Sequence, residues 1–226
     1  MKKKTIILSA ILFVSFACFA LFSQQNDAKL YRKAATKGDA EAQYSLGMMY
    51  REGQDWQQHT AKAAKWLRKA AEQGHAKAQY DLSKIYRDGQ GVTQDYAEAA
   101  KWTRKAAEQG HAKAQYNLAE IYRNGQGVTQ DYAEAVKWFR KAAEQGHVGG
   151  QSGLGLMYRQ GLGVTQDYTE AYFWFNLAAA SSSGLHRELS IDFRNSAARN
   201  LSQNELMDAQ KRAREWKPKT AELPDQ

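Results

Sequence analysis

A 36-residue period organises most of this 226-residue chain and constrains its fold more than any other feature. Residues 75–110 and 111–146 align without a gap and differ at only 6 positions. The same frame fits residues 39–74 and 147–182 with more differences. The tryptophans that recur at this period are Trp66, Trp102, Trp138 and Trp174. A fixed period of this length indicates an array of repeats in which neighbouring units bury a shared core.

The first half of each unit is predicted to be an amphipathic helix. In the second unit this helix covers residues 76–87, and it places Ala78, Leu82 and Ile85 on one face. The chain has no proline before Pro218, so no residue type that breaks helices interrupts the array. The sequence therefore predicts an all-α fold.

The second half of each unit is predicted to be another helix, preceded by a turn. Gly89 and Gly91 lie in this turn, where glycine is free to adopt positive φ. The helix covers about residues 96–109, and Asp95 with Glu98 has the form of a capping box at its start. Each unit is thus a helix pair that cannot bury its apolar face alone.

The repeat frame divides the chain into eight segments. They are a signal peptide over residues 1–23, a half repeat over 24–38, repeats over 39–74, 75–110, 111–146 and 147–182, capping helices over 183–217 and a flexible tail over 218–226. In the first full repeat, Asp55 replaces the second turn glycine, and His59 and Thr60 replace the Asp-Tyr pair. We expect a looser or differently bent turn there. In the C-terminal segment, Ser202 and Glu205 form another capping box.

The first residues have the pattern of a secretory signal. Three lysines, Lys2 to Lys4, precede an apolar run from Ile6 to Phe22. Cleavage after Ala20 or Ser23 would release a periplasmic or secreted protein. Two alternatives are an uncleaved membrane anchor formed by residues 5–22 and lipidation at Cys18.

Cys18 is the only cysteine in the chain. Its position in the predicted leader leaves the mature protein without a disulfide, a cysteine zinc site or an iron–sulfur site. The stability of an exported chain of this kind must therefore come from packing.

The third unit carries a characteristic string of residues. It comprises Ala114-Gln115, Leu118, Tyr122, Gly125-x-Gly127-Val128, Asp131-Tyr132, Ala135, Trp138, Lys141-Ala142-Ala143 and Gly146. This string resembles the Sel-one-like repeat family, a relative of the tetratricopeptide arrays, and the resemblance covers about residues 24–182. It implies a right-handed α/α superhelical solenoid that acts as a binding scaffold for other proteins. Some secreted members carry a cysteine pair in each repeat and are linked to β-lactam binding, and this chain lacks those cysteines.

Catalytic motifs are missing from the sequence. It contains no Ser-x-x-Lys, Gly-x-Ser-x-Gly, His-Glu-x-x-His or Gly-x-x-x-x-Gly-Lys spacing, so we expect neither an enzyme nor a cofactor. His75, His111 and His147 occupy one repeat position. Because helical units lie ~10 Å apart, these histidines cannot share one metal ion, and we expect no metal site. The net charge of +8 is too mild to indicate nucleic-acid binding.

Candidate binding residues lie on the first helix of each unit, on the side opposite the core face. These positions are Tyr44, Met48 and Arg51; Tyr80, Lys84 and Arg87; Tyr116, Glu120 and Arg123; and Ser152, Leu156 and Arg159. In stacked helix pairs, the first helix usually lines the concave surface. Because tyrosine and arginine often anchor interfaces, we hypothesise that this surface holds an acidic or extended segment of a partner protein. The alternative is structural: each tyrosine packs on the next unit, and each arginine stabilises the last turn of its helix.

The sequence therefore favours an exported, monomeric, non-enzymatic scaffold for protein–protein interaction. One alternative is a binder of cell-wall peptides or β-lactams, and another is a secreted factor that binds host proteins. These functions share one fold, so fold alone does not select among them.

Overall fold

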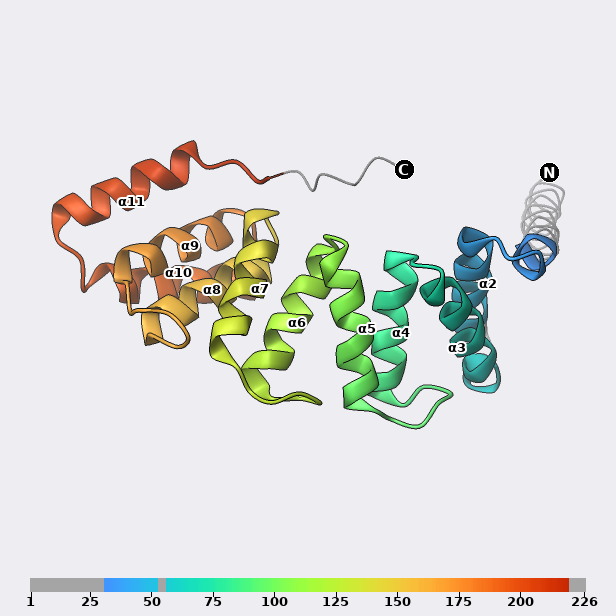
Figure 1. The fold of residues 1–226 in the computed structure, drawn as a ribbon. Helices are drawn as coiled ribbons and strands as arrows, with labels where there is room; N and C mark the ends of the chain where they lie inside the picture. Colours follow the sequence, from blue (N-terminus) through green and yellow to red (C-terminus); the bar gives the residue numbers. More distant parts are fainter. Residues whose placement is uncertain (1–30, 53–55, 220–226) are drawn as a thin grey trace, which may run out of the picture. The chain divides into compact units, whose positions relative to one another are not determined.

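The computed structural model describes residues 31–52 and 56–219. Residues 31–36 are helical, and ten further helices follow in chain order, with no strand in these ranges (Figure 1). Their bounds are α2 Ala40–Glu52, α3 Trp56–Glu72, α4 Ala76–Asp88, α5 Tyr96–Glu108, α6 Ala112–Asn124, α7 Tyr132–Glu144, α8 Val148–Gln160, α9 Tyr168–Ala180, α10 Gly184–Ala198 and α11 Gln203–Glu215. The all-α solenoid of helix pairs predicted from the repeat is confirmed. The predicted signal peptide lies outside the described residues.

The described chain falls into two compact units. One contains the residues up to 78 together with 90–92, and the other contains 79–89 and the residues from 93 onwards.

The first unit is built around the pair α2 and α3. Gly47 on α2 faces Leu67 on α3 so closely that an added Cβ would lie 2.7 Å from the leucine Cγ. The buried Gln43 amide donates to the Ala35 carbonyl at 3.1 Å and accepts from Gln73 at 2.7 Å. A small residue and a fully bonded amide therefore let the two helices approach each other.

The first full repeat differs from the others at its internal turn, as its sequence predicts. Helix α3 begins at Trp56, whereas the position equivalent to the start of α5 is Thr60. As a result α3 has 17 residues and α5 has 13. His59 and Thr60, which replace the usual Asp-Tyr pair, thus belong to a helix that begins one turn earlier than in the other repeats.

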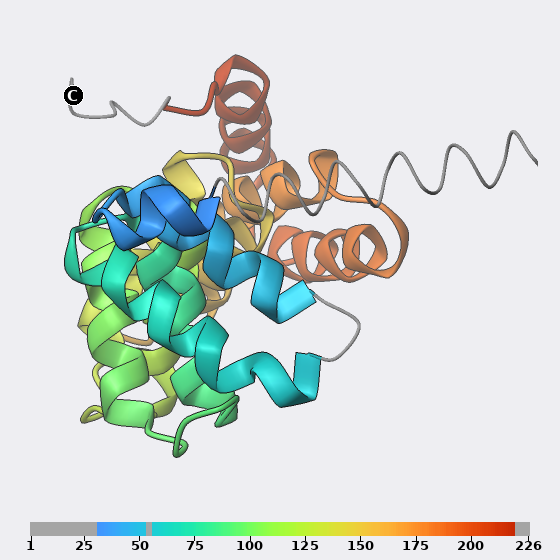
Figure 2. The same ribbon diagram turned by 90° about the vertical axis from the view of Figure 1, so that its right-hand side faces the viewer.

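The second unit stacks consecutive helices from α4 to α9. Each of α5, α6, α7 and α8 packs on the helix that follows it, and both α10 and α11 pack on α9. Figure 2 shows α10 and α11 on different sides of α9. The core contains Leu118, Trp138, Phe139, Leu154 and Phe175 among its buried residues. The tryptophans of the period are buried in this unit, as expected for an interior layer.

The turn within each repeat of the second unit is closed by repeated hydrogen bonds. The Asp131 backbone N–H donates to the Tyr122 carbonyl at 2.9 Å, and the Gln130 amide donates to the Arg123 carbonyl at 2.8 Å. The Asp131 carboxylate also caps α7 by accepting from the Glu134 N–H at 3.0 Å. These bonds satisfy polar groups that helix ends leave open.

The expected capping boxes differ in outcome. Asp95 caps α5 as predicted, but the Glu98 carboxylate turns to Lys101 at 2.8 Å and to the Trp102 indole N–H at 3.1 Å. Ser202 with its glutamate forms the complete reciprocal box at the start of α11. The tryptophan competes for the carboxylate because its buried N–H needs an acceptor.

Large rings on one helix fit against glycines on the next. Phe139 of α7 is fully buried and lies against Gly153 of α8, where an added Cβ would be 2.5 Å from the ring. Phe175 of α9 fits against Gly155 in the same way, at 2.8 Å. These pairs set how closely α8 packs on its two neighbours.

In the last repeat, the glutamate in the first turn of the second helix has a different partner. Arg212 of α11 pairs with Glu170 at 2.5 Å and lies over the Phe173 ring at 4.6 Å. Glu170 stands at the repeat position of Glu98, so Trp174 loses the partner that Trp102 has. Its buried Nε1 has no hydrogen-bond partner within the described chain.

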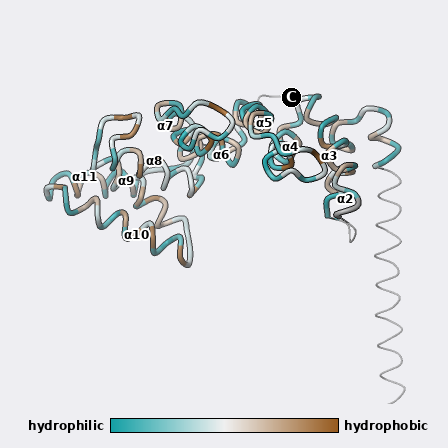
Figure 3. Tube along the Cα trace, turned by 90° about the horizontal axis from the view of Figure 1, so that it is seen from below, coloured by the Kyte–Doolittle hydropathy of each residue, from teal (hydrophilic) through white to brown (hydrophobic). Residues whose placement is uncertain are grey.

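Figure 3 shows hydrophilic as well as hydrophobic residues among the described helices. None of the helices in the described ranges has both the length and the apolar character needed to cross a membrane.

Candidate partner-binding groove

The predicted tyrosine ladder lies between the repeats and packs on histidine rings. In the second unit, Tyr80 stacks on His111 with ring centroids 4.7 Å apart, and Tyr116 stacks on His147 at 5.0 Å. In the first unit, Tyr44 stacks on the equivalent histidine at 4.6 Å. The tyrosines therefore serve inter-repeat packing, which is the structural alternative considered above.

The histidines are held in place by capping the next helix. His111 Nδ1 accepts from the Ala114 N–H at 3.2 Å, and His147 Nδ1 accepts from the Gly150 N–H at 3.1 Å. Burial lowers the pKa of His147, and the nearby Lys113 and His111 lower it further. A neutral ring with an unprotonated Nδ1 is what the cap requires.

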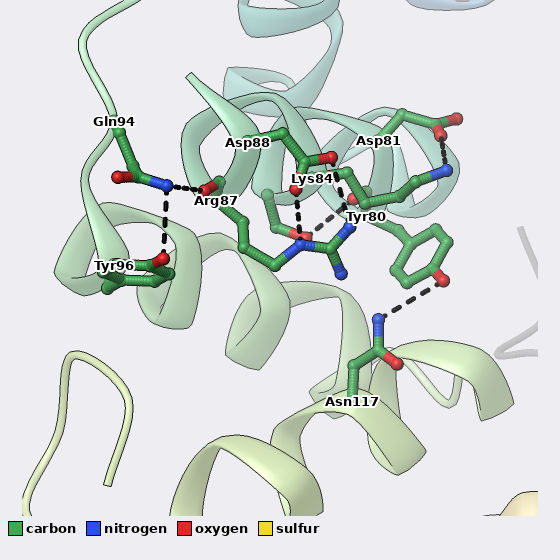
Figure 4. A network of polar contacts seen from close by, with 9 residues as sticks. Tyr80, Asp81, Lys84, Arg87, Asp88, Gln94, Tyr96 and Asn117 are labelled. Carbon is green, nitrogen blue, oxygen red and sulfur yellow. Dashed lines mark hydrogen bonds and ion pairs between the residues drawn. The ribbon is translucent and has the colours of Figure 1, made fainter. Parts of the chain in front are cut away.

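The predicted cations of the second unit lie beside carboxylates or rings of the same chain. Arg87 binds both carboxylate oxygens of Asp88 at 2.8 and 3.1 Å, and this hydrogen bonding raises the pKa of Arg87 (Figure 4). Lys84 lies 3.5 Å from Asp81, and Arg159 lies over the Phe193 ring at 4.9 Å. In the first unit, Arg51 occupies the last turn of α2.

Arg123 is the one predicted cation that carries an unmet donor in the described chain. Its guanidinium pairs with Glu120 at 2.5 Å, but its Nε is buried without a hydrogen-bond partner. Buried polar atoms rarely stay unpaired, so this N–H is an exception within the described chain.

A cleft of about 280 Å³ lies between α4, α5 and α6 of the second unit. It contains four of the predicted residues, Lys84, Arg87, Tyr116 and Glu120. The other residues lining it are Ser83, Tyr96, Ala99, Thr103, Asn117, Ile121, Asn124 and Gln126. Figure 4 shows the polar side chains along its α4 side, with the Asn117 amide donating to the Tyr80 hydroxyl at 3.3 Å.

A second cleft, also of about 280 Å³, lies between α6, α8 and α10. It shares Tyr116 and Glu120 with the first cleft and includes Arg123, so the two clefts are neighbours on α6. Apolar residues dominate its far side, where Leu156, Leu189 and Phe193 meet. We call the two clefts together the α4–α10 groove. Tyr116 stays neutral in it because burial raises the pKa of its phenol.

The first cleft exists where one repeat has small or polar residues in place of larger ones. Thr103 lines its floor and bonds to the Ala99 carbonyl at 2.8 Å, whereas Phe139 fills the equivalent place one repeat later. The phenylalanine fits there because its neighbour is Gly153, and Asn117 occupies that position beside Thr103. Phe139 with Gly153 thus fills this space in one repeat, whereas Thr103 with Asn117 leaves it open in the other.

Thr103, Asn117 and Asn124 are groove residues that periodicity alone does not single out. Each is one of the 6 positions at which repeats 75–110 and 111–146 differ. Five of those 6 positions contribute a residue to the lining of the first cleft. The divergence between two nearly identical repeats is therefore the sequence signal that could have located them.

Metal chemistry has no visible basis in residues 31–52 and 56–219. No group of three or more His, Cys, Asp or Glu side chains in these ranges could hold a metal ion.

The family profile and the solved structures that match this chain point to the same family. The sequence profile of the Sel1 repeat matches residues 28–39, 40–75, 76–111, 112–147 and 149–183. No curated protein matches the chain. Sel1 repeat proteins generally act as protein-interaction scaffolds and are typically not enzymes.

Two solved structures are similar to this chain. A Sel1 repeat protein from Oxalobacter formigenes is 37% identical, with a TM-score of 0.64 over 72% of this chain and 47% of that one. The protein c5321, a protective antigen of uropathogenic Escherichia coli with the same repeat fold, is 30% identical, with a TM-score of 0.53 over 84% and 48%. This chain therefore spans about half the length of either relative. The profile covers most of the chain, which therefore belongs to the Sel1 repeat family.

Proposed function

We propose that this chain is an exported scaffold that holds an extended segment of a partner protein in the α4–α10 groove. The scaffold role of Sel1 repeat proteins supports the general class. The groove is the surface that we propose for binding, because two neighbouring clefts of the second unit share Tyr116 and Glu120 there.

The chemistry of the groove favours an extended peptide over a highly acidic one. Asn117, Asn124 and Gln126 offer amide donors and acceptors that match the backbone of a peptide. The charges of Arg87 and Arg123 are already neutralised by neighbouring carboxylates. A strongly acidic ligand would have to displace these carboxylates from the arginines. The first cleft therefore suits a polar stretch of the partner, and the apolar side of the second cleft suits a hydrophobic side chain.

The observation that carries this proposal is where the two nearly identical repeats diverge. Five of their 6 differences contribute to the first cleft, and the sixth, Ala100 in one repeat and Val136 in the next, is buried away from it. Variation gathered at one cleft makes that surface differ between two otherwise similar repeats, as a binding specificity requires.

Filling the first cleft tests the proposal. The double variant Thr103→Phe with Asn117→Gly copies the packing of Phe139 against Gly153, so we expect an intact fold with no cleft. Peptides selected from a displayed library on the full chain should bind this variant at least about tenfold more weakly, by fluorescence anisotropy.

A matched control is Lys101→Glu on the opposite face of α5, where the lysine pairs with Glu98 in solvent. It should leave the peptide affinity unchanged. Equal affinity of the cleft-filled variant and the parent chain, with the same helix content by circular dichroism, would refute the groove as the binding site.

Export is supported by the lysine-led apolar segment and by the similarity to c5321, which is described as a protective antigen. Expression with a C-terminal tag in a Gram-negative host, followed by fractionation, should place the chain in the periplasm or medium. Its N-terminus, read by mass spectrometry, should follow Ala20 or Ser23. A full-length chain confined to the cytoplasm would contradict export.

A further inference from the structure

One seven-residue turn occurs three times in the chain with an identical sequence. Lys-Ala-Ala-Glu-Gln-Gly-His forms residues 69–75, 105–111 and 141–147, and each copy links the second helix of one repeat to the first helix of the next. The glycines have φ values of 91°, 85° and 82°. In every copy the glycine and histidine N–H groups donate to the two alanine carbonyls, at 2.9–3.2 Å. The three turns therefore present the same backbone and the same side chains.

The third turn is covered by the C-terminal segment of the chain itself. Helix α11 ends at Glu215, and the next residue, Trp216, begins an extended stretch with a φ of −69° and a ψ of 139°. The Lys219 backbone N–H donates to the Glu144 carbonyl at 2.8 Å, and its ammonium group pairs with the Glu144 carboxylate at 3.0 Å. Pro218 lies against Gly146, where an added Cβ would be 3.4 Å from the proline Cβ. Pro218 and Lys219, expected to belong to a flexible tail, are thus held in place.

The physical basis of this contact lies in the end of the helix. The last carbonyls of a helix have no intrahelical partner, and the Lys219 N–H satisfies one of them. The negative end of the helix dipole and the Glu144 carboxylate both favour a cation there. Gly146 has no side chain, which leaves a flat surface for the proline ring. The turn therefore recognises an extended proline–lysine sequence.

The first two copies of the turn are not covered in this way. Neither Gly74 nor Gly110 has another atom within 4 Å of the position that a Cβ would take. Glu72 and Glu108 are exposed, and neither forms an ion pair within the described ranges. We infer that the turns 69–75 and 105–111 are open binding sites for an extended proline–lysine segment of a partner protein.

The open turns differ from the covered one just after the histidine. Lys77 and Lys113 stand at the position that Gly149 occupies after the third turn. Their positive charge opposes a basic segment, so binding at the open turns depends on the attraction of Glu72 and Glu108, which salt screens. None of these turn residues lines the α4–α10 groove, so the inference does not depend on the proposed function.

The test uses the full chain and a labelled peptide with the sequence of residues 215–219, Glu-Trp-Lys-Pro-Lys, amidated at its end. Fluorescence anisotropy at low salt should show binding to the wild-type chain. The double variant Glu72→Gln with Glu108→Gln should raise the dissociation constant about two- to fivefold, the range for losing an exposed ion pair. A peptide with glutamate in place of its last lysine should bind the wild-type chain more weakly.

The third turn provides a control of identical sequence. Glu144→Gln makes the same change in a turn that the protein's own tail already covers, so it should not weaken peptide binding. No binding by the wild-type chain would overturn the inference. So would unchanged affinity in the double variant, or an equal loss in Glu144→Gln. Glu72 and Glu108 are exposed and Glu144 is half-buried, and we expect each replacement to keep the helix content, which circular dichroism would verify.

Discussion

Replacing Phe139 with alanine is expected to lower the free energy of unfolding by about 3–5 kcal/mol, the range for truncating a buried aromatic residue. Phe139 is fully buried, fits against Gly153 and lies 6.0 Å from the Tyr116 ring, measured between centroids. The cavity left behind cannot close easily, because helices on both sides hold α7 in place. Urea denaturation followed by circular dichroism would measure the loss.

The equivalent position one repeat earlier supplies the comparison. Thr103→Ala removes a small side chain and one hydrogen bond to the Ala99 carbonyl, so we expect a loss of only about 1 kcal/mol. A loss for Phe139→Ala no larger than that for Thr103→Ala would show that the ring does not support the inter-repeat core.

Gly127→Ala is expected to destabilise the chain by about 2–5 kcal/mol. Gly127 has a φ of 72°, which disfavours any residue with a Cβ. It also lies against the backbone of the preceding repeat, where an added Cβ would be 2.2 Å from the Tyr96 carbonyl oxygen. Because backbone atoms cannot move aside as a side chain can, the turn would have to separate from the neighbouring repeat. Thermal unfolding followed by circular dichroism would detect this as a lower Tm.

Gly125→Ala separates the two causes. Gly125 has nearly the same φ, 69°, but the atoms nearest to an added Cβ belong to the same turn and are no closer than the Gln130 Cβ at 3.3 Å. Its replacement should therefore cost about 1–2 kcal/mol, from the backbone conformation alone. Similar losses in the two variants would argue against close packing between the turn and the preceding repeat.

The helices and the core could be predicted because the period repeats the same information. Helix α4 was expected over residues 76–87 and covers Ala76–Asp88, with Ala78 and Leu82 fully buried as predicted. The positive φ of Gly89 and Gly91 is confirmed as well. These features depend on residues close together in sequence, where the periods of helix and turn are directly visible.

The groove was harder to predict because it depends on what each side chain meets in the next repeat. The sequence placed Tyr80 and Tyr116 on the side of the helix opposite the core face, and it could not show that they pack against the core and against histidine rings. It likewise could not show that Arg87 turns to the adjacent Asp88. The cleft itself arises from pairs such as Thr103 with Asn117, which become neighbours only through folding. Contacts of this kind are set by packing, and residue type alone does not determine them.

The contact between Arg212 and Glu170 determines how the array ends. A tryptophan N–H left unpaired in the interior costs about 1–3 kcal/mol, so α11 must contribute at least that much in apolar contact and charge pairing to remain bound. Once it is bound, α11 covers part of the surface of α9, so a further helix pair could stack there only if α11 moved away.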